Sequence, residues 1–205
     1  MKPMRLVLCS MALVSLLAAP AAHASVPSPS NSIVDPCFLL EPAGTLAFTV
    51  VVRDLASNPI ANTSIVIDYC ACPELMLCES GGLRPQIATS CTIEGVSDAS
   101  GTRVFKMKGG GGCGGTAIKV YADGVLLAQI RAASPDQNGD LSVDAADATL
   151  LATKVGGTDL TGDLNCDGAV TAADQAALVL YFNHTCLTPT STRHSTWGDL
   201  KVRYR

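Results

Sequence analysis

The chain is poor in aromatic and basic residues, and it contains no C-x-x-C pair. Its 205 residues include one Trp, four Tyr and four Phe, and 14 Lys and Arg stand against 18 Asp and Glu. Binding to phosphates depends on clustered positive charge, so nucleic acid is not an expected partner. Structural zinc sites usually use closely spaced thiolate pairs, so zinc is not expected either. Few aromatic side chains are available for stacking on a sugar.

The N-terminus has the pattern of a secretory signal. Lys2 and Arg5 precede an apolar run over residues 6–19, and Ala22-His23-Ala24 offers small residues where a signal peptidase cuts. We therefore expect residues 1–24 to be cleaved. The rest has no apolar stretch near the roughly 20 residues that cross a bilayer, which predicts a secreted protein, extracellular or at the cell surface, with no transmembrane segment.

The sequence after the signal predicts strands and turns. Residues 25–36 are rich in Ser and Pro and predict a flexible leader. Further on, segments with strand composition alternate with turn signals, which favours a β-sandwich over residues 37–133. The expected strands cover residues 45–52, 63–69, 102–107, 116–122 and 125–131.

Two details of this region add to the prediction. Asp123-Gly124 separates the last two strands and is typical of a tight hairpin turn. The glycine run over residues 109–115 lacks the Gly-Lys-Ser/Thr ending of a phosphate-binding loop, so we expect a mobile hairpin connection there.

The segments VVVRDLASNPIANTSIVIDY, VSDASGTRVFKM and AIKVYADGVLLA resemble the bacterial Ig-like domains of the invasin and intimin kind. Those domains share an N-P-I/V turn after the first long strand and a D-x-x-G turn before a later one. The resemblance covers residues 45–131 and implies an Ig-like fold. The β region here departs from the family in carrying six cysteines, from Cys37 to Cys113, and a long insertion between Tyr69 and Val96.

A duplicated acidic segment follows the strands. Between Asp136 and Asp174 lie eight of the fourteen Asp in the chain, one Lys and no Glu. Shifting the sequence by 27 positions superposes DQNGDLSVDAADATLL on DLNCDGAVTAADQAAL, which is an internal repeat.

Each repeat places oxygen-bearing side chains at positions 1, 3, 5, 9 and 12 of a 12-residue loop. Ca²⁺ takes roughly six to eight oxygen ligands, and such a loop wraps the ion by aiming alternate residues inward. The predicted ligands of the first loop are Asp136, Asn138, Asp140, the carbonyl of Ser142, Asp144 (directly or through water) and Asp147. Those of the second loop are Asp163, Asn165, Asp167, the carbonyl of Ala169, Thr171 and Asp174.

An apolar helical stretch follows each loop, over residues 148–155 and 175–182, without a clear helix before either loop. This duplicated loop-then-helix pattern resembles the type I dockerin domain from residue 136 to about 186, within a module that we expect over residues 134–187. The resemblance implies two Ca²⁺ sites and a cohesin-like or other cell-surface partner. In cohesin-binding dockerins, positions 10 and 11 commonly include hydroxyl residues, whereas both repeats here have Ala-Ala.

Position 6 of such a loop favours Gly, because the backbone turns there through positive φ. The second loop has Gly168 and the first has Leu141. We therefore expect the first site to bind calcium more weakly.

Cys9 lies in the signal, which leaves eight of the nine cysteines. An even number in an exported chain is typical of disulfides. Cys166 is at position 4 of the second loop and Cys186 lies just beyond its helix, so we expect these two to pair. The alternative is that either one reaches a cysteine of the β region. The other six are Cys37, Cys70, Cys72, Cys78, Cys91 and Cys113.

The sequence thus predicts a mainly β Ig-like sandwich, a small all-α dockerin/EF-hand-like calcium-binding module, and a linker with a basic tail over residues 188–205. We expect a secreted calcium-binding protein that acts as a binding or structural module. The alternative is a cellulosome-type component whose dockerin binds a cohesin and which takes part in polysaccharide degradation through carbohydrate binding. No catalytic residues are predicted, since only His184 and His194 follow the signal and no separate catalytic domain fits.

Overall fold

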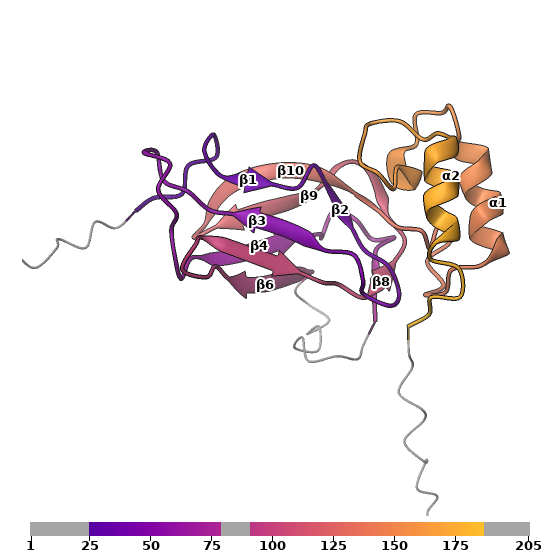
Figure 1. Cartoon of the computed structure of the whole chain (residues 1–205), viewed down its shortest axis with the longest axis horizontal. Coiled ribbons are helices and arrows are strands. Elements are labelled where there is room, and N and C mark those ends of the chain that lie inside the picture. Colours follow the sequence, from indigo (N-terminus) through magenta and orange to yellow (C-terminus); the bar gives the residue numbers. More distant parts are fainter. Residues whose placement is uncertain (1–24, 79–90, 187–205) are drawn as a thin grey trace, which may run out of the picture.

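The computed structural model describes residues 25–78 and 91–186, and it is mainly β with two short helices near the C-terminus (Figure 1). The strands form one elongated body, and both helices lie beyond one of its ends. The expected signal peptide and the C-terminal tail lie outside the described residues. Within the described residues, no helix is long and apolar enough to cross a membrane.

The strands form two larger sheets and one short ribbon. The first sheet has the order β1-β3-β7, with β1 (Ile33–Val34), β3 (Phe48–Val51) and β7 (Thr102–Phe105). The second has the order β2-β10-β9-β4-β6, with β2 (Cys37–Leu39), β4 (Ser64–Asp68), β6 (Thr92–Val96), β9 (Cys113–Ala122) and β10 (Val125–Ala133). The ribbon pairs β5 (Met76–Leu77) with β8 (Gly109–Gly110).

The hairpin of β9 and β10 confirms the two strands expected on either side of Asp123-Gly124. Asp123 has φ 44° and Gly124 has φ 81°, the left-handed conformations that a tight two-residue hairpin requires. β10 runs on to Ala133 because β2 pairs with its last residues in parallel, with Phe38 opposite Ala132.

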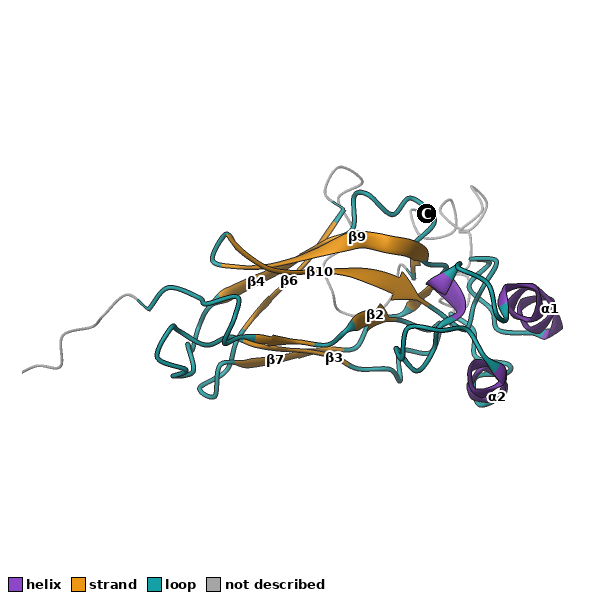
Figure 2. Ribbon diagram, turned by 90° about the horizontal axis from the view of Figure 1, so that it is seen from above, coloured by secondary structure: helices purple, strands orange, loops and turns teal. Residues whose placement is uncertain are grey.

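The two larger sheets lie one above the other (Figure 2), and their buried side chains form one apolar core. Along β4 and β9, alternate residues point inward, so that Ile65, Ile67, Ile118 and Val120 are fully buried. Phe38 of β2 meets Phe48 of β3 edge-to-face, with their ring centroids 5.1 Å apart. This contact joins the two sheets, and an aromatic pair of this kind adds to the stabilisation from apolar burial.

Residues 25–36 differ from the flexible leader expected from their Ser and Pro content. The backbone N–H of Ser28 donates to the carbonyl of Arg53 at 2.7 Å, and Ile33 pairs with Val51 as part of β1. The two β-branched residues of β1 extend an edge of the first sheet, which composition alone did not indicate.

The helices confirm the two expected after the repeats, but each begins three residues earlier. α1 spans Ala145–Lys154 and α2 spans Ala172–Val179, and a short 3-10 helix, η1 (Leu160–Gly162), precedes the second loop. Each α-helix begins with a capping box, in which the position 9 side chain accepts from the first turn and the position 12 Asp reaches back to the position 9 N–H. This cap starts the helix inside the loop.

A second small apolar core lies between the loops and the helices. Its members come from both repeats, which places the two helices against each other. They are Val143, Leu151, Leu164, Val170 and Leu178.

Four disulfides are present in the described residues, and two of them join the β region to the repeats. The bonds are Cys37–Cys166, Cys70–Cys91, Cys72–Cys113 and Cys78–Cys186.

The expected Cys166–Cys186 pair is therefore wrong, and the alternative holds, because each of these two cysteines bonds to a cysteine of the β region. Cys186 is held beside the first loop, where its N–H donates to the carbonyl of Leu141 at 3.0 Å. Cys166 belongs to the second loop and lies against β2 through Cys37. The two cysteines thus lie beside different loops.

A buried carboxylate also links the β region to the segment after α2. Glu41 is fully buried, accepts from the N–H groups of Ala43 (2.7 Å) and Thr45, and lies 2.9 Å from Nδ1 of His184. Burial acts to raise the pKa of Glu41, but the N–H donors of Thr45 and Ala43 and the contact with His184 outweigh it. The pKa of Glu41 is therefore lowered from its ordinary value.

We expect Glu41→Gln to lower the free energy of unfolding by about 2 kcal/mol at neutral pH, because the amide has no charge and only one accepting oxygen, so a donor beside it loses its acceptor. A carboxylate with a lowered folded-state pKa contributes stability above its unfolded-state pKa, and that contribution is lost as the pH falls through the folded-state value. The gap between variant and wild type should thus narrow in acid. Urea unfolding at several pH values checks this, with exposed Glu94→Gln as the control, and a gap independent of pH would contradict it.

Candidate metal centre

In the first loop, the residues at positions 1 and 12 are fully buried and point inward. The two oxygens of Asp136 accept from the N–H groups of Gly139 and Leu141, both at 2.8 Å. Asp147 accepts from the N–H of Gln137 at one oxygen and from that of Asp144 at the other, again at 2.8 Å. Two carboxylates thus organise the loop backbone from its inside.

The second loop repeats this arrangement 27 residues later. Asp163 accepts from the N–H of Gly168 at 2.7 Å, and its other oxygen accepts from that of Asp167 at 3.1 Å. Asp174 accepts from the N–H groups of Leu164 and Thr171, both at 2.8 Å. Both Asp163 and Asp174 are fully buried.

Positions 3 and 5 contact each other in both loops and are exposed. The side-chain amide of Asn138 donates to Asp140, and that of Asn165 donates to Asp167, each at 2.8 Å. The position 5 carboxylates also accept from the N–H of position 7, where the predicted carbonyl ligands Ser142 and Ala169 lie.

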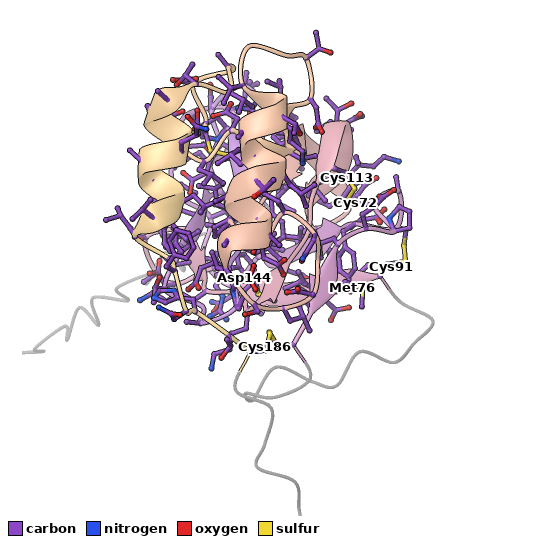
Figure 3. The ribbon with its side chains drawn as sticks, turned by 90° about the vertical axis from the view of Figure 1, so that its right-hand side faces the viewer. Cys72, Met76, Cys91, Cys113, Asp144 and Cys186 are labelled. Carbon is purple, nitrogen blue, oxygen red and sulfur yellow. A yellow bond between two sulfur atoms is a disulfide. The ribbon has the colours of Figure 1, made fainter. Side chains whose placement is uncertain are left out.

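The position 9 residues serve as helix N-caps. Asp144 accepts from the N–H of Ala146 at 2.7 Å with one oxygen, and Thr171 accepts from that of Ala173 at 3.2 Å. Figure 3 shows Asp144 at the end of the helical part where Cys186 also lies. All the predicted ligands of each repeat therefore lie in one short loop.

The two loops share their backbone conformation as well as their side-chain contacts. Position 6 is left-handed in both loops, with φ 68° at Leu141 and 94° at Gly168. Position 4 is left-handed too, with φ 74° at Gly139 and 61° at Cys166. The alignment of the two repeats gave no reason to expect this second left-handed position. A leucine in this conformation costs roughly 1–2 kcal/mol, which is the reason to expect a weaker first site.

The negative charge of the first loop is not paired with a positive side chain within the described residues. Burial raises the pKa of Asp136 to about 6, and the charges of Asp147 and Asp140 act in the same direction, while the N–H groups of Leu141 and Gly139 oppose it. In residues 25–78 and 91–186, no Lys, Arg or His forms an ion pair with a carboxylate of the first loop. Backbone N–H donors offset part of the cost of burying a carboxylate, and a cation or a proton compensates the charge that remains.

The donor set fits a calcium ion. Every predicted ligand offers oxygen, and the four fully buried carboxylates supply most of the negative charge. A hard cation that accepts many oxygen ligands in a flexible geometry suits such a loop, whereas Mg²⁺ demands a stricter octahedral one.

The glycine run, expected to be a mobile connection, packs against the first loop instead. The N–H of Gly111 donates to the carbonyl of Asp136 at 2.8 Å. A Cβ on Gly110 would lie 1.7 Å from an Asp136 oxygen, and one on Gly111 would lie 2.1 Å from the carbonyl of Glu74. Glycine is needed because three segments of backbone meet there.

The second loop also contacts the β region. Nη2 of Arg131, on β10, forms an ion pair with Asp163, and the Arg131 side chain is 15% exposed. Arg131 lies opposite Cys37 in the pairing of β10 with β2, and Cys37 bonds to Cys166 in the same loop. An ion pair and a disulfide thus hold this loop to one point of the sheet.

A cleft of about 510 Å³ lies between the glycine run and the repeats. The basic residue that lines this cleft is Lys154, whose ammonium donates to Gln137 and Thr161 at 2.7 Å and lies 3.5 Å from Asp159. Lys154 thus connects the end of α1 to the first loop and to the residues before the second loop. No aromatic side chain lines the described part of this cleft.

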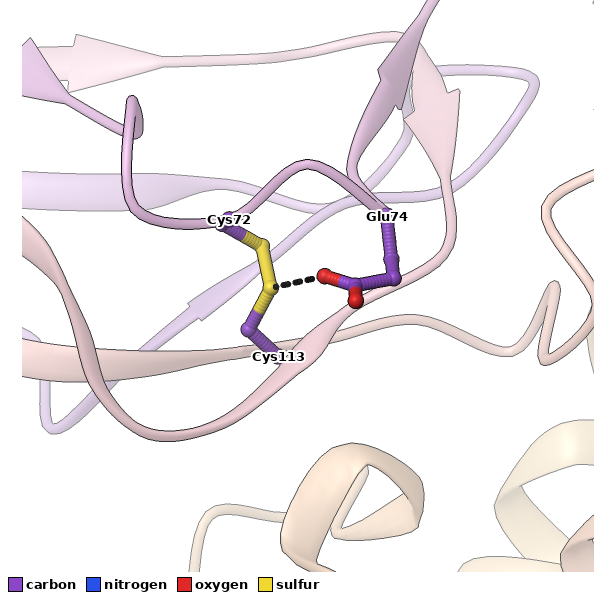
Figure 4. A group of neighbouring side chains, drawn as sticks. All are labelled: Cys72, Glu74 and Cys113. Carbon is purple, nitrogen blue, oxygen red and sulfur yellow. Dashed lines mark hydrogen bonds between the residues drawn. A yellow bond between two sulfur atoms is a disulfide. The ribbon is translucent and has the colours of Figure 1, made fainter.

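The group of Cys72, Glu74 and Cys113 has the composition of a metal site, but the two cysteines form a disulfide (Figure 4). A carboxylate oxygen of Glu74 lies 3.2 Å from the Cys113 sulfur. A disulfide offers no thiolate, so this group is not a metal site.

Comparisons with known proteins give little further information. No family model matches the chain, and no curated protein matches it. A solved structure that does match is the adhesin InvE of Yersinia pseudotuberculosis, at 17% identity and a TM-score of 0.27, over 52% of this chain. The chain spans 26% of the adhesin. A TM-score this low carries neither a fold nor a function over to this chain.

We expect Gly110→Ala to lower the free energy of unfolding by about 2 kcal/mol, because the new methyl group overlaps Asp136 and forces the first loop away from β8. Gly114→Ala is the matched control in the same run, since its Cβ would meet only Asp159 at 3.8 Å. Thermal and urea unfolding of both variants test this. Equal effects of the two substitutions would contradict the assigned contact.

Proposed function

We propose that this chain is a secreted calcium-binding protein in which an Ig-like β-sandwich and a dockerin-like double calcium loop form one structural or binding unit. The observation that carries the proposal is a repeated arrangement: the buried carboxylates at positions 1 and 12 of each loop accept hydrogen bonds from backbone N–H groups of that loop. Two loops with the same carboxylate and backbone arrangement support two sites for the same ion.

Calcium in this proposal contributes folding free energy. The clustered carboxylates repel one another until a cation compensates them, and an ion that binds only the folded loops stabilises them by mass action. The loops also contact the β region at Gly110 and Arg131, so stabilising them also stabilises the boundary between the two parts.

The proposed role is binding or structural rather than catalytic. Two disulfides, Cys37–Cys166 and Cys78–Cys186, connect the sandwich proposed for residues 37–133 to the module proposed for residues 134–187. Such cross-links suit a rigid extracellular protein in which the sandwich and the module keep fixed positions. Disulfides persist in oxidising compartments.

The test is a calcium titration of the full oxidised chain by isothermal calorimetry, followed by thermal unfolding with calcium or with EGTA. We expect two ions per chain and a melting temperature that rises with calcium concentration. Asp147→Asn and Asp174→Asn should each remove one ion, because each deletes the carboxylate that closes one loop. No binding at millimolar calcium would overturn the proposed function.

A cohesin-like partner is the second candidate function, and exposed apolar side chains on the helices favour it. Val179 and Leu180 at the end of α2 are 59% and 75% exposed, and Leu150 on α1 is 38% exposed. In contrast, Phe48, Phe105 and Tyr69 are buried, which removes most of the strand aromatics that a polysaccharide would stack on.

A pull-down with purified cohesins in calcium tests this second candidate. We expect capture that Leu180→Asp reduces and that EGTA abolishes, because the helices present these side chains only while the loops are folded. Leu55→Asp, at an equally exposed position far from the helices in sequence, is the control. Capture that neither Leu180→Asp nor EGTA affects would contradict the candidate.

A further inference from the structure

We propose that Arg131 is a built-in cation of the second loop: it holds Asp163 when calcium is absent and weakens calcium binding at that loop. This inference rests on the proposed calcium function, and it concerns only the residue that the β region directs at the second loop. Its basis is the ion pair between Nη2 of Arg131 and a carboxylate oxygen of Asp163.

The ion pair is buried and fixed from two sides. Asp163 is fully buried and the Arg131 side chain is 15% exposed, so water screens the pair much less than it screens a surface pair. Arg131 is held in β10 opposite Cys37, and the Cys37–Cys166 bond holds the loop three residues beyond Asp163. The guanidinium and the carboxylate therefore face each other as a consequence of the fold.

The remaining contacts of Arg131 do not explain its position. Its Nε is buried and has no hydrogen-bond partner among the described residues, which is an unfavourable arrangement. The ion pair with Asp163 is the interaction that offsets this cost. Removing one member of a buried pair leaves the other charge uncompensated, which is strongly destabilising.

The guanidinium makes the two loops electrostatically unequal. The second loop has three carboxylates, at Asp163, Asp167 and Asp174, and one guanidinium beside the first of them. The first loop has four carboxylates and no ion-paired base within the described residues. Calcium affinity in such loops depends on the number of ligand charges.

The hydrogen bonds that Asp163 already accepts also favour weaker calcium binding at the second loop. One of its oxygens already accepts from both Gly168 and Arg131, whereas the other accepts only from Asp167, at 3.1 Å. A divalent cation entering this loop meets the positive charge of Arg131 on the same carboxylate. The weakening from Leu141 in the first loop is thus matched by a weakening of different origin in the second.

The experiment isolates the second loop by placing Asp147→Asn in the full chain, which removes the carboxylate that closes the first loop. In this background we expect Arg131→Gln to bind Ca²⁺ about tenfold more tightly by calorimetry at constant ionic strength, since a like charge is removed. Arg131→Lys keeps the charge and should stay near the parent affinity. Arg53→Gln, an arginine that bonds to the carbonyl of Ser57, is the control and should change nothing.

Thermal unfolding supplies a second readout. In EGTA, Arg131→Gln should melt several degrees below its parent, because Asp163 is left buried without a cation. Saturating calcium should remove that difference. If Arg131→Gln does not fold even in calcium, the proposal is overturned, because the guanidinium would then be needed with the ion bound.

The outcomes separate this inference from the proposed function. If the wild-type chain binds two ions and Arg131→Gln leaves the affinity of the second loop unchanged, the inference is overturned and the proposed function stands. Binding in Arg131→Gln where the parent binds none supports the inference directly. If no variant binds calcium, both proposals are overturned.

Discussion

The structure of the repeats depends on the burial of four aspartates in two short loops. Asp136, Asp147, Asp163 and Asp174 are all fully buried, and each uses its oxygens to bind backbone N–H groups of its own loop. These bonds compensate part of the lost hydration but not the negative charge. The helices follow from the same residues, because the position 12 Asp that closes each loop also completes the capping box of the next helix. Loop and helix therefore form together.

The two loops meet the β region in different ways. The first loop brings Asp136 against backbone, and only glycine at position 110 leaves room for its carboxylate. The second brings Asp163 against the guanidinium of Arg131. One carboxylate is thus packed beside an uncharged strand and the other beside a positive charge, although the loops share one sequence pattern. The two loops therefore differ in their surroundings as well as in their own residues.

Local features of this fold could be predicted from the sequence, whereas long-range ones could not. The β9–β10 hairpin and the helices after each repeat have signals within a few residues, at Asp123-Gly124 and at the position 12 aspartates. The disulfides of Cys166 and Cys186 span 129 and 108 residues, and spacing within the repeat indicated a local bond instead. The packing of the glycine run could not be predicted for the same reason, because the contacts that require glycine there come from other parts of the chain. Arg131 carried no sequence signal at all, since its partner is defined only by the fold.

These long disulfides also limit what calcium does in the proposed function. A cross-link that closes a loop of about 100 residues removes on the order of 4–5 kcal/mol of chain entropy from the unfolded state in the simplest model. Cys37–Cys166 and Cys78–Cys186 keep the repeats next to the β region whether or not an ion is bound. Under the proposed function, loss of calcium would loosen the loops and their helices without separating them from the β region. In the proposed function, the ion would therefore govern the order of the helical surface, whereas the disulfides fix where that surface lies on the β region.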